Sequence, residues 1–509
     1  MIGTPPRGFT ASSEHSTPVW LYAVGILAAL LVGSAAAAPK LLLALVIVAV
    51  VVSSLIAGVR NPWVGLSAII ASYPVVNTLR TIYTAHDLPV FAAGVRFLPD
   101  LLQLLVIAQL MVCAIRDRRL RLQIFPDDMP VVVYILMGVY SVIVAVQHTH
   151  PYGAINGWYL SITPAIFYLV IRWLKPTARQ SLRFLNWMIL CYCIVLVPSL
   201  YVYATRPEWY ILLQHAEHGF FVPEGLDKFA FWRFYPRMQA FLFEENHWGT
   251  LSELVAVLSA AYLVRSPDLW KRYLLMIVAT SCMVFSISRG AMISFGIAMV
   301  ILLLHYGKHR RNLVIALLAL FALVDLGLYV LRDMPIVYVS MQRLDTVGTK
   351  AAEKGEVAND RTHQWKAGWK IFTMMPSGMG LGTVGNGASL SKMTPFVVGD
   401  GLYVRILAEQ GIPGIIAFAY LIVSIPWILW RYRHVAPEEW RPLGIGLFAF
   451  HFGFCVHGIG ANTFDYYCVA PVYFMLLGLY VSAVYRHLEE QSAATLSPRY
   501  VPLLPARDV

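Results

Sequence analysis

The chain has 509 residues, of which 58% are hydrophobic and only 13% are charged, and its formal net charge is +11. Soluble domains carry about one quarter charged residues, so this composition excludes a string of soluble domains. The positive charge falls mainly in short loops between apolar runs, which argues against a nucleic-acid surface and indicates membrane topology instead. All six cysteines lie within apolar runs and are expected to be free, packed thiols.

Apolar runs recur from Val19 to Tyr485. They predict an all-α polytopic membrane protein with about 14 transmembrane helices, because a span needs about 20 apolar residues. The predicted spans are centred near residues 28, 50, 70, 106, 138, 164, 193, 256, 279, 298, 321, 420, 450 and 476. We expect the first run to remain as an uncleaved helix. Residues 1–17 are then an N-terminal tail, residues 18–486 the integral bundle, and residues 487–509 a polar, disordered tail.

Basic clusters between the spans predict the orientation of the bundle. Five of them fall on one side, namely residues 116–119, 172–183, 265–272, 308–311 and 431–433. Positive residues collect in cytoplasmic loops, so this side and both termini are predicted to be cytoplasmic. The opposite, external side receives two long loops, at about residues 205–246 and 332–401.

The second external loop is predicted to contain an amphipathic helix from Thr362 to Met374, with Arg361 at its start. A guanidinium is a planar fork that fits phosphate, and Trp365 and Trp369 would hold the helix at the membrane surface. The segment Gly380–Gly385 that follows matches a dinucleotide fingerprint in form only, because no buried strand precedes it. We interpret this segment as a flexible turn that lets a substrate approach the backbone.

Arg289 lies in the sequence Phe285-Ser-Ile-Ser-Arg-Gly-Ala291, which we place in a tight external turn between two spans. An arginine at the margin of the bilayer is costly and tends to mark function. The alternative is that its side chain extends to the lipid headgroups. The flanking serines and glycine favour a functional, polar turn.

A second polar cluster precedes the span near residue 256. It contains Arg237, followed by Glu244, Glu245 and His247. The last three are candidate proton acceptors. Alternatively, the two glutamates form an acidic cap, since negative charge is favourable at a helix N-terminus.

Asp400 comes directly before the span near residue 420, and is either the N-cap of that helix or a catalytic base. Arg405 and Glu409 are one helical turn apart and would pair within the bilayer. His451 and His457 share an apolar helix and are expected to be packed, hydrogen-bonded residues.

Taken in order, these motifs resemble the O-antigen ligase/polymerase superfamily of bacterial envelope glycosyltransferases. The matching segments are residues 237–246, Ser286–Gly290, Arg361 with Trp365, Pro376–Gly382 and Asp400–Gly414. The resemblance implies a GT-C-like helical fold in the inner membrane, with the active site under a large periplasmic loop. It also implies a glycan donor on undecaprenyl diphosphate, gripped by Arg289 and Arg361 without a metal or other cofactor. Arg237 and Arg405 are further candidates for this diphosphate site.

Within the superfamily, the ligases that attach O-antigen to lipid A-core carry His-Asn where this chain has Asp400-Gly401. Acidic residues there are more similar to chain polymerases. We therefore expect an inverting polymerase that joins a lipid-linked glycan to a lipid-linked repeat unit, with Asp400 or Glu245 as the base and Glu244 as a further candidate. The alternatives are an O-antigen ligase and, from another class, a transporter or flippase of lipid-linked sugars. Membrane lipids and a chain-length regulator are further candidate partners.

Overall fold

The computed structural model describes residues 61–85, 98–116, 123–148, 151–205, 245–263, 269–286, 288–306, 356–384 and 400–496, with a few single residues between these ranges. Within them the regular structure is entirely helical, which confirms the all-α prediction. The elements are α3 (Pro62–Ala85), α5 (Leu98–Arg116), η1 (Pro126–Asp128), α6 (Met129–His148), α7 (Pro151–Ser161), α8 (Thr163–Leu174), α9 (Ala178–Thr205), α12 (Glu245–Leu263), α13 (Leu269–Phe285), α14 (Arg289–Tyr306), α18 (Glu356–Met374), α20 (Leu402–Tyr432), α21 (Arg441–His457), η3 (Thr463–Asp465) and α22 (Ala470–Leu496).

Most of the predicted spans coincide with these helices. The centres near residues 28, 50 and 321 lie outside the described residues, and each of the others falls within a helix. Among the described helices, four are long and apolar enough to cross a membrane, and the pair α7 and α8, bent by 50°, would make a fifth. The protein is therefore an integral membrane protein, and the total of about 14 spans stays a prediction. Helix α22 continues to Leu496, so the start of the predicted C-terminal tail is helical.

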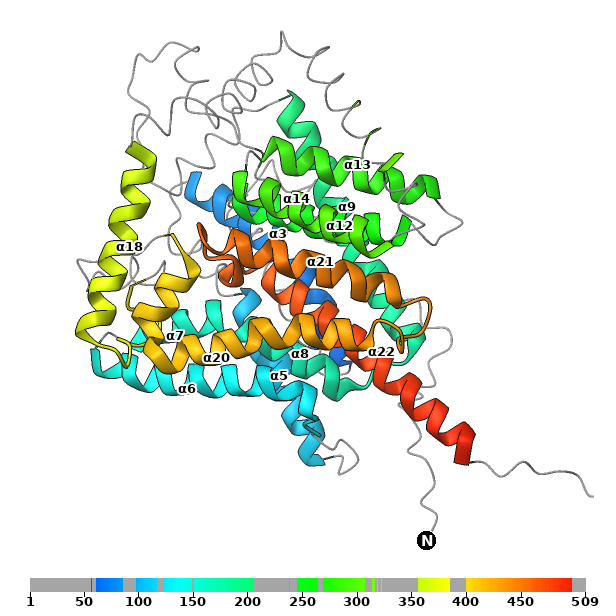
Figure 1. Ribbon diagram of the computed structural model, residues 1–509, viewed down its shortest axis with the longest axis horizontal. Helices are drawn as coiled ribbons and strands as arrows, with labels where there is room; N and C mark the ends of the chain where they lie inside the picture. The colour runs from blue at the N-terminus through cyan, green and yellow to red at the C-terminus, as the bar shows by residue number, and fades with distance from the viewer. Residues whose placement is uncertain are drawn as a thin grey trace, which may run out of the picture.

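The helices form a bundle whose long members run roughly along one direction. Helix α20 lies beside α6, α8 beside α22, and α12 is packed against α13, α14 and α21 (Figure 1). Helix α18 differs, since it crosses the left end of the bundle at a steep angle to α6 and α20 in this view. That arrangement places the predicted amphipathic helix across the end of the spans, as expected for a helix at a membrane surface.

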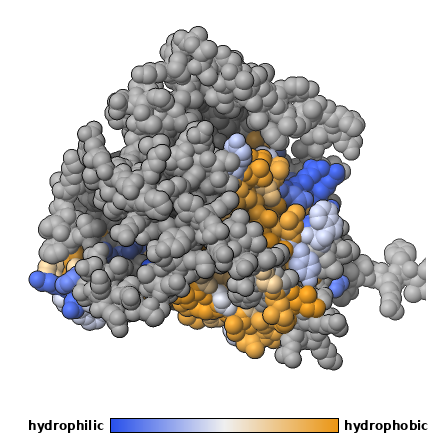
Figure 2. Space-filling view, turned by 90° about the horizontal axis from the view of Figure 1, so that it is seen from above, coloured by the Kyte–Doolittle hydropathy of each residue, from blue (hydrophilic) through white to orange (hydrophobic). Residues whose placement is uncertain are grey.

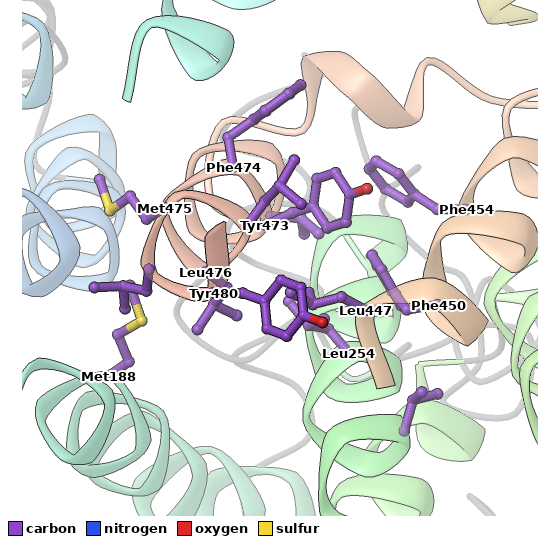
Figure 3. Packing of buried hydrophobic residues seen from close by; sticks show 14 of the residues in the cluster. Met188, Leu254, Leu447, Phe450, Phe454, Tyr473, Phe474, Met475, Leu476 and Tyr480 are labelled. Atoms are coloured by element: carbon purple, nitrogen blue, oxygen red, sulfur yellow. The ribbon is translucent and has the colours of Figure 1, made fainter. Parts of the chain in front are cut away.

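Aromatic side chains fill the centre of the bundle. Phe450 and Phe454 of α21 meet Tyr473 of α22, and Leu254 of α12 and Leu447 lie beside them (Figure 3). The outside of the bundle is also apolar. Figure 2 shows hydrophobic surface between hydrophilic patches toward the two ends of the long axis. A soluble monomer rarely exposes so much contiguous apolar surface, which supports a lipid-facing exterior.

A buried ionic cluster joins the helices at the end of the bundle where α6 begins. Asp128 is fully buried and accepts hydrogen bonds from Tyr168 Oη (2.8 Å) and Arg172 Nε (3.0 Å). Next to it, Asp127 pairs with Arg431 at the end of α20 (3.8 Å). Two of the basic clusters that predict the cytoplasmic side are thus held at the same end of the bundle.

Replacing Asp128 by alanine is expected to destabilise the protein. The change leaves the buried Arg172 charge without its carboxylate, and breaking a buried pair in this way costs about 3–5 kcal/mol. Thermal unfolding of the purified protein in detergent measures the effect. Glu490→Ala is the control, because its ion pair with Arg486 lies at the surface and is worth at most about 1 kcal/mol. Equal unfolding temperatures for the two variants would contradict the assignment.

Helix α20 is broken close to its first turns. Gly411 has φ 64° and ψ −158°, so the hydrogen-bond ladder is interrupted there. The segment Pro376–Gly380 supplies the missing partners. The bonds run from Met379 N–H to Ala408 O (3.0 Å), from Gly380 N–H to Glu409 O (2.7 Å), and from Ile412 N–H to Pro376 O (2.9 Å). The break is therefore closed by protein backbone, as irregular structure at membrane depth requires.

The same contacts correct the interpretation of the glycine-rich segment as a flexible turn. Gly380 has φ 96°, and a Cβ added there would overlap the backbone of Ala145 on α6. A Cβ on Gly382 would overlap the carbonyl of Gly153 on α7. The glycines between Pro376 and Val384 are needed because α6, α7 and α20 lie too close to leave room for a side chain. The prediction that a substrate approaches this backbone is therefore wrong. Residues 385–399 lie outside the described part of the chain.

Candidate active site

Arg289 is the first residue of α14, and its side chain is exposed. Two serines build the turn before it. Ser286 Oγ donates to Met283 O (2.6 Å) and accepts from Ser288 N–H (3.3 Å), while Ser288 Oγ accepts from Ala291 N–H (3.5 Å). A cation at a helix N-terminus gains nothing from the helix dipole, which favours anions there. The free backbone N–H groups in the first turn of α14 and the Arg289 guanidinium would both attract an anion bound at this helix end.

The first turn of α14 is packed against the end of α21. A Cβ on Gly290 would overlap the ring of His457, which is buried and lies 3.4 Å from Thr250 Oγ1 through its Nδ1. This confirms the prediction that His457 is packed. His451 is packed as well, with Nδ1 2.7 Å from Tyr473 Oη and Nε2 2.8 Å from Ile422 O. The end of α21 thus fixes the position of Arg289.

Asp400 also lies near the end of α21. The following Leu402 N–H donates to Gly458 O (3.0 Å), directly after α21. Gly401 has φ 113° and occupies the N-cap position of α20, without a side-chain capping bond. Because Gly401 is the N-cap of α20, Asp400 is not the capping residue of this helix. The N-cap interpretation of Asp400 is therefore wrong, and its role as a catalytic base stays a prediction.

Helix α18 is docked on Asp400 and Gly401. Asp400 N–H donates to Gln364 Oε1 (2.8 Å), and a Cβ on Gly401 would lie only 2.7 Å from Trp365 Nε1. Arg361 belongs to the same helix, one turn before Trp365. Residues one turn apart lie on the same helix face, so Arg361 and Trp365 share one face of α18. The side chain of Arg361 lies outside the described part, and its role stays a prediction.

The start of α12 lies against the turn that carries Arg289. A Cβ on Gly249 would approach Ser286 Oγ to 2.5 Å, and Met238 N–H donates to Phe285 O (3.1 Å) just before that turn. Glu245 is the first residue of α12, although its side chain is not described, and Glu244 and Arg237 lie outside the described residues. The N-termini of α12, α14 and α20 therefore meet at one end of the bundle, where their dipoles would add for an anion.

Arg405 is directed into the protein. It is 3% exposed, and its Nη2 donates to Asp465 Oδ1 (2.7 Å) while Nη1 lies 3.6 Å from Glu409 Oε2. Glu409 Oε1 also accepts from Gly382 N–H (3.0 Å). The predicted pair of Arg405 and Glu409 is confirmed. With two carboxylates compensating its charge, these contacts favour a structural role for Arg405 over contact with a diphosphate.

Sequence reasoning missed Asp465. It lies in η3, between α21 and α22, and accepts from Ser161 Oγ (3.1 Å) as well as from Arg405. Burial raises the pKa of the Asp465 carboxyl above its ordinary value, and the Arg405 guanidinium limits that rise. The signal available in the sequence was an acidic residue between the last two predicted spans, together with an arginine at the start of the span near residue 420. Among the described residues no group of three histidines, cysteines or carboxylates could hold a metal ion.

Comparison with known proteins identifies one family. Residues 274–419 match the O-antigen ligase family, whose members are glycosyltransferase-like enzymes. No curated protein matches the chain. The matched region is less than a third of the 509 residues, and it extends from α13 through α14 and α18 into the first half of α20. It contains Arg289, Arg361 and Asp400, whereas Arg237, Glu244 and Glu245 precede it.

Proposed function

We propose that the protein is a polysaccharide polymerase of the O-antigen ligase/polymerase superfamily, because residues 274–419 match the O-antigen ligase family. It joins a glycan on undecaprenyl diphosphate to a lipid-linked repeat unit at the periplasmic face of the bacterial inner membrane. The observation that carries the proposal is that the first turns of α12, α14 and α20 all pack around the end of α21, with Arg289 in the first turn of α14 and Asp400 just before α20. An array of this kind suits a substrate with a dianionic group next to the reacting carbon.

In this reaction the acceptor hydroxyl attacks the anomeric carbon of the donor from the face opposite the diphosphate. The new glycosidic bond forms as the bond from the anomeric carbon to the diphosphate oxygen breaks, and the electron pair leaves with the diphosphate. Arg289, Arg361 and the dipoles of α12 and α14 stabilise the charge that develops there. The hydroxyl proton goes to Asp400, or to Glu245 or Glu244.

The chain has Asp400-Gly401 where lipid A-core ligases carry His-Asn, which supports a polymerase over a ligase. Deleting the gene separates the two. Loss of a polymerase leaves single repeat units on the lipid carrier and on the cell surface. Loss of a ligase instead strands full-length chains on the lipid carrier.

A transporter of lipid-linked sugars is the candidate from another class, and the break in α20 is the feature that favours it. Transporters use broken helices whose free backbone groups bind the substrate near the midplane of the bilayer. In α20 those groups are already bonded to Pro376–Gly380. An assay of the purified protein with a synthetic lipid-diphosphate repeat unit distinguishes the two functions. Chain growth without ATP supports the polymerase, whereas movement of the substrate across the membrane without bond formation would overturn it.

Replacing Arg361 by alanine is expected to reduce chain growth by about 10²–10³-fold, the usual loss when one donor to a developing oxyanion is removed. The assay measures the rate of chain elongation by purified protein in lipid nanodiscs. Lys370→Ala is the matched control, because Lys370 is an exposed cation further along α18. A similar loss in both variants would point to a general effect of charge on α18, and an active Arg361→Ala would remove Arg361 from the diphosphate site.

A further inference from the structure

Helix α18 lies across the end of the bundle with its apolar side against the protein (Figure 1). Ile371 is 3% exposed and packs in a small cluster with Ala408 of α20 and with Val384, at the end of the glycine-rich segment. Gly368, one turn before Ile371, is buried on the same side. An amphipathic helix bound to a membrane buries its apolar side among the lipids. In α18 protein already covers that side, so the outward side is free for another partner.

The outward side of α18 combines tryptophan with hydrophilic side chains. From Thr362 to Thr373 every exposed side chain is a threonine, a histidine, a lysine or one of two tryptophans, Trp365 and Trp369. The tryptophans are 38% and 58% exposed, and no exposed leucine, isoleucine or valine accompanies them in this stretch. A surface that is apolar only at aromatic rings suits an amphiphilic ligand better than an acyl chain.

These two residues form a tryptophan stripe that begins beside the candidate base. A Cβ added to Gly401 would lie 2.7 Å from Trp365 Nε1, so the indole edge lies directly against the residue that follows Asp400. The neighbouring Gln364 Oε1 accepts from Asp400 N–H (2.8 Å). Trp369 is one turn further on the same face, about 6 Å along the helix axis. The stripe therefore leads away from Asp400 in steps comparable with the length of one sugar residue.

We propose that the tryptophan stripe binds the acceptor glycan, with successive sugar rings stacked on Trp365 and Trp369, an inference that rests on the proposed function. A sugar ring has a face of C–H bonds and a rim of hydroxyl groups, so it matches an aromatic ring set among hydrophilic side chains. The C–H hydrogens are slightly positive, and the face of an indole is negative.

Two further features suit this role. Phe372 packs against Trp369, with ring centroids 5.3 Å apart and planes at 49°, which restricts the Trp369 ring before a ligand arrives. Such preorganisation lowers the cost of binding. In addition, a sugar stacked on Trp365 would lie next to Asp400. The stripe would thus orient the hydroxyl whose proton Asp400 takes, and orientation of this kind lowers the reaction barrier.

A binding assay tests the proposal without lipid or diphosphate. The probe is the repeat-unit oligosaccharide of the cell that makes this protein, released from its lipid by mild acid, and calorimetry follows its binding to the full-length protein in nanodiscs. Trp369→Ala should weaken binding about tenfold, equivalent to about 1.4 kcal/mol. Trp427→Ala is the matched control, since Trp427 is a 64% exposed tryptophan of α20 outside the stripe, and should bind as the unmodified protein does.

Two substitutions at the same position separate stacking from general apolar contact. Trp369→Tyr retains an aromatic face and should keep most of the affinity, whereas Trp369→Leu retains an apolar side chain alone and should lose as much as Trp369→Ala. Normal binding by Trp369→Leu would overturn the proposal and assign the stripe to lipid contact, and so would a lack of binding by the unmodified protein.

Chain growth is assayed separately with the lipid-linked repeat unit. Trp369→Ala should raise the KM for that unit and leave kcat nearly normal, because the stripe binds the sugar equally before and during the reaction. Oligosaccharide binding that depends on Trp369 but is accompanied by no chain growth would retain the glycan site and reject the polymerase. Chain growth with binding indifferent to Trp369 would retain the polymerase and reject the glycan site.

Discussion

Replacing Arg289 by alanine is expected to abolish chain growth while the protein still folds and inserts. The side chain is exposed at the first position of α14, and its removal breaks no ion pair within the described part of the chain. A departing diphosphate would lose a charged donor, which corresponds to about 10²–10³-fold in rate. The rate of elongation by purified protein in nanodiscs measures the loss, with the unfolding temperature as the measure of folding.

Two further variants test whether the effect depends on the position of the removed positive charge and on the shape of the guanidinium. Lys271→Ala removes an exposed cation near the start of α13, the end of that helix remote from the turn carrying Arg289, and should keep normal activity. Arg289→Lys keeps the charge but loses the planar fork, and should restore part of the rate. If Arg289→Ala elongates chains at the normal rate, the diphosphate is bound elsewhere.

The strongest predictions from the sequence were those that depend on local pattern. Apolar runs of about 20 residues predict spans because the bilayer sets their length. The pair of Arg405 and Glu409 followed from a spacing of four residues on one helix. The amphipathic pattern likewise predicted α18, although the helix begins at Glu356 rather than at Thr362.

Contacts between segments that are distant in the sequence could not be predicted from a local pattern. The partner of Arg405 is Asp465, 60 residues further along the chain, and no local pattern connects them. The composition of the glycine-rich segment predicts that another molecule or chain segment can come close to its backbone, but not which one. In the folded structure the backbone of α6, α7 and α20 lies there instead of a substrate.

The candidate site was intermediate between these cases. The sequence singled out Arg289, Arg361 and Asp400 from three separate motifs, with no means of placing them together. In the structure, Gly290 packs on His457, and Leu402 N–H donates to Gly458 O, so the segments that carry Arg289 and Asp400 both lie at the end of α21. In each of these two segments a residue near the candidate residue makes the contact with α21, and no local sequence pattern predicts such a contact.

Replacing Asp400 by asparagine is expected to lower the rate of chain growth by about 10²–10⁴-fold, the usual contribution of a general base. The substitution keeps the size of the side chain and removes its ability to take up a proton. It also keeps the backbone N–H that donates to Gln364 Oε1, so the docking of α18 is preserved. A loss of rate can then be attributed to the carboxylate itself.

The alternative base is Glu245, the first residue of α12, or Glu244, which precedes it in the sequence. Glu245→Gln and Glu244→Gln are the matched variants, since each also removes one carboxylate. If Asp400 is the base, these two should change the rate much less than Asp400→Asn does, because negative charge at a helix N-terminus contributes to stability rather than to proton transfer. An undiminished rate in Asp400→Asn, with a loss in Glu245→Gln, would move the proton transfer to α12. The acceptor hydroxyl would then lie on the α12 side of Arg289 instead of between Arg289 and α18.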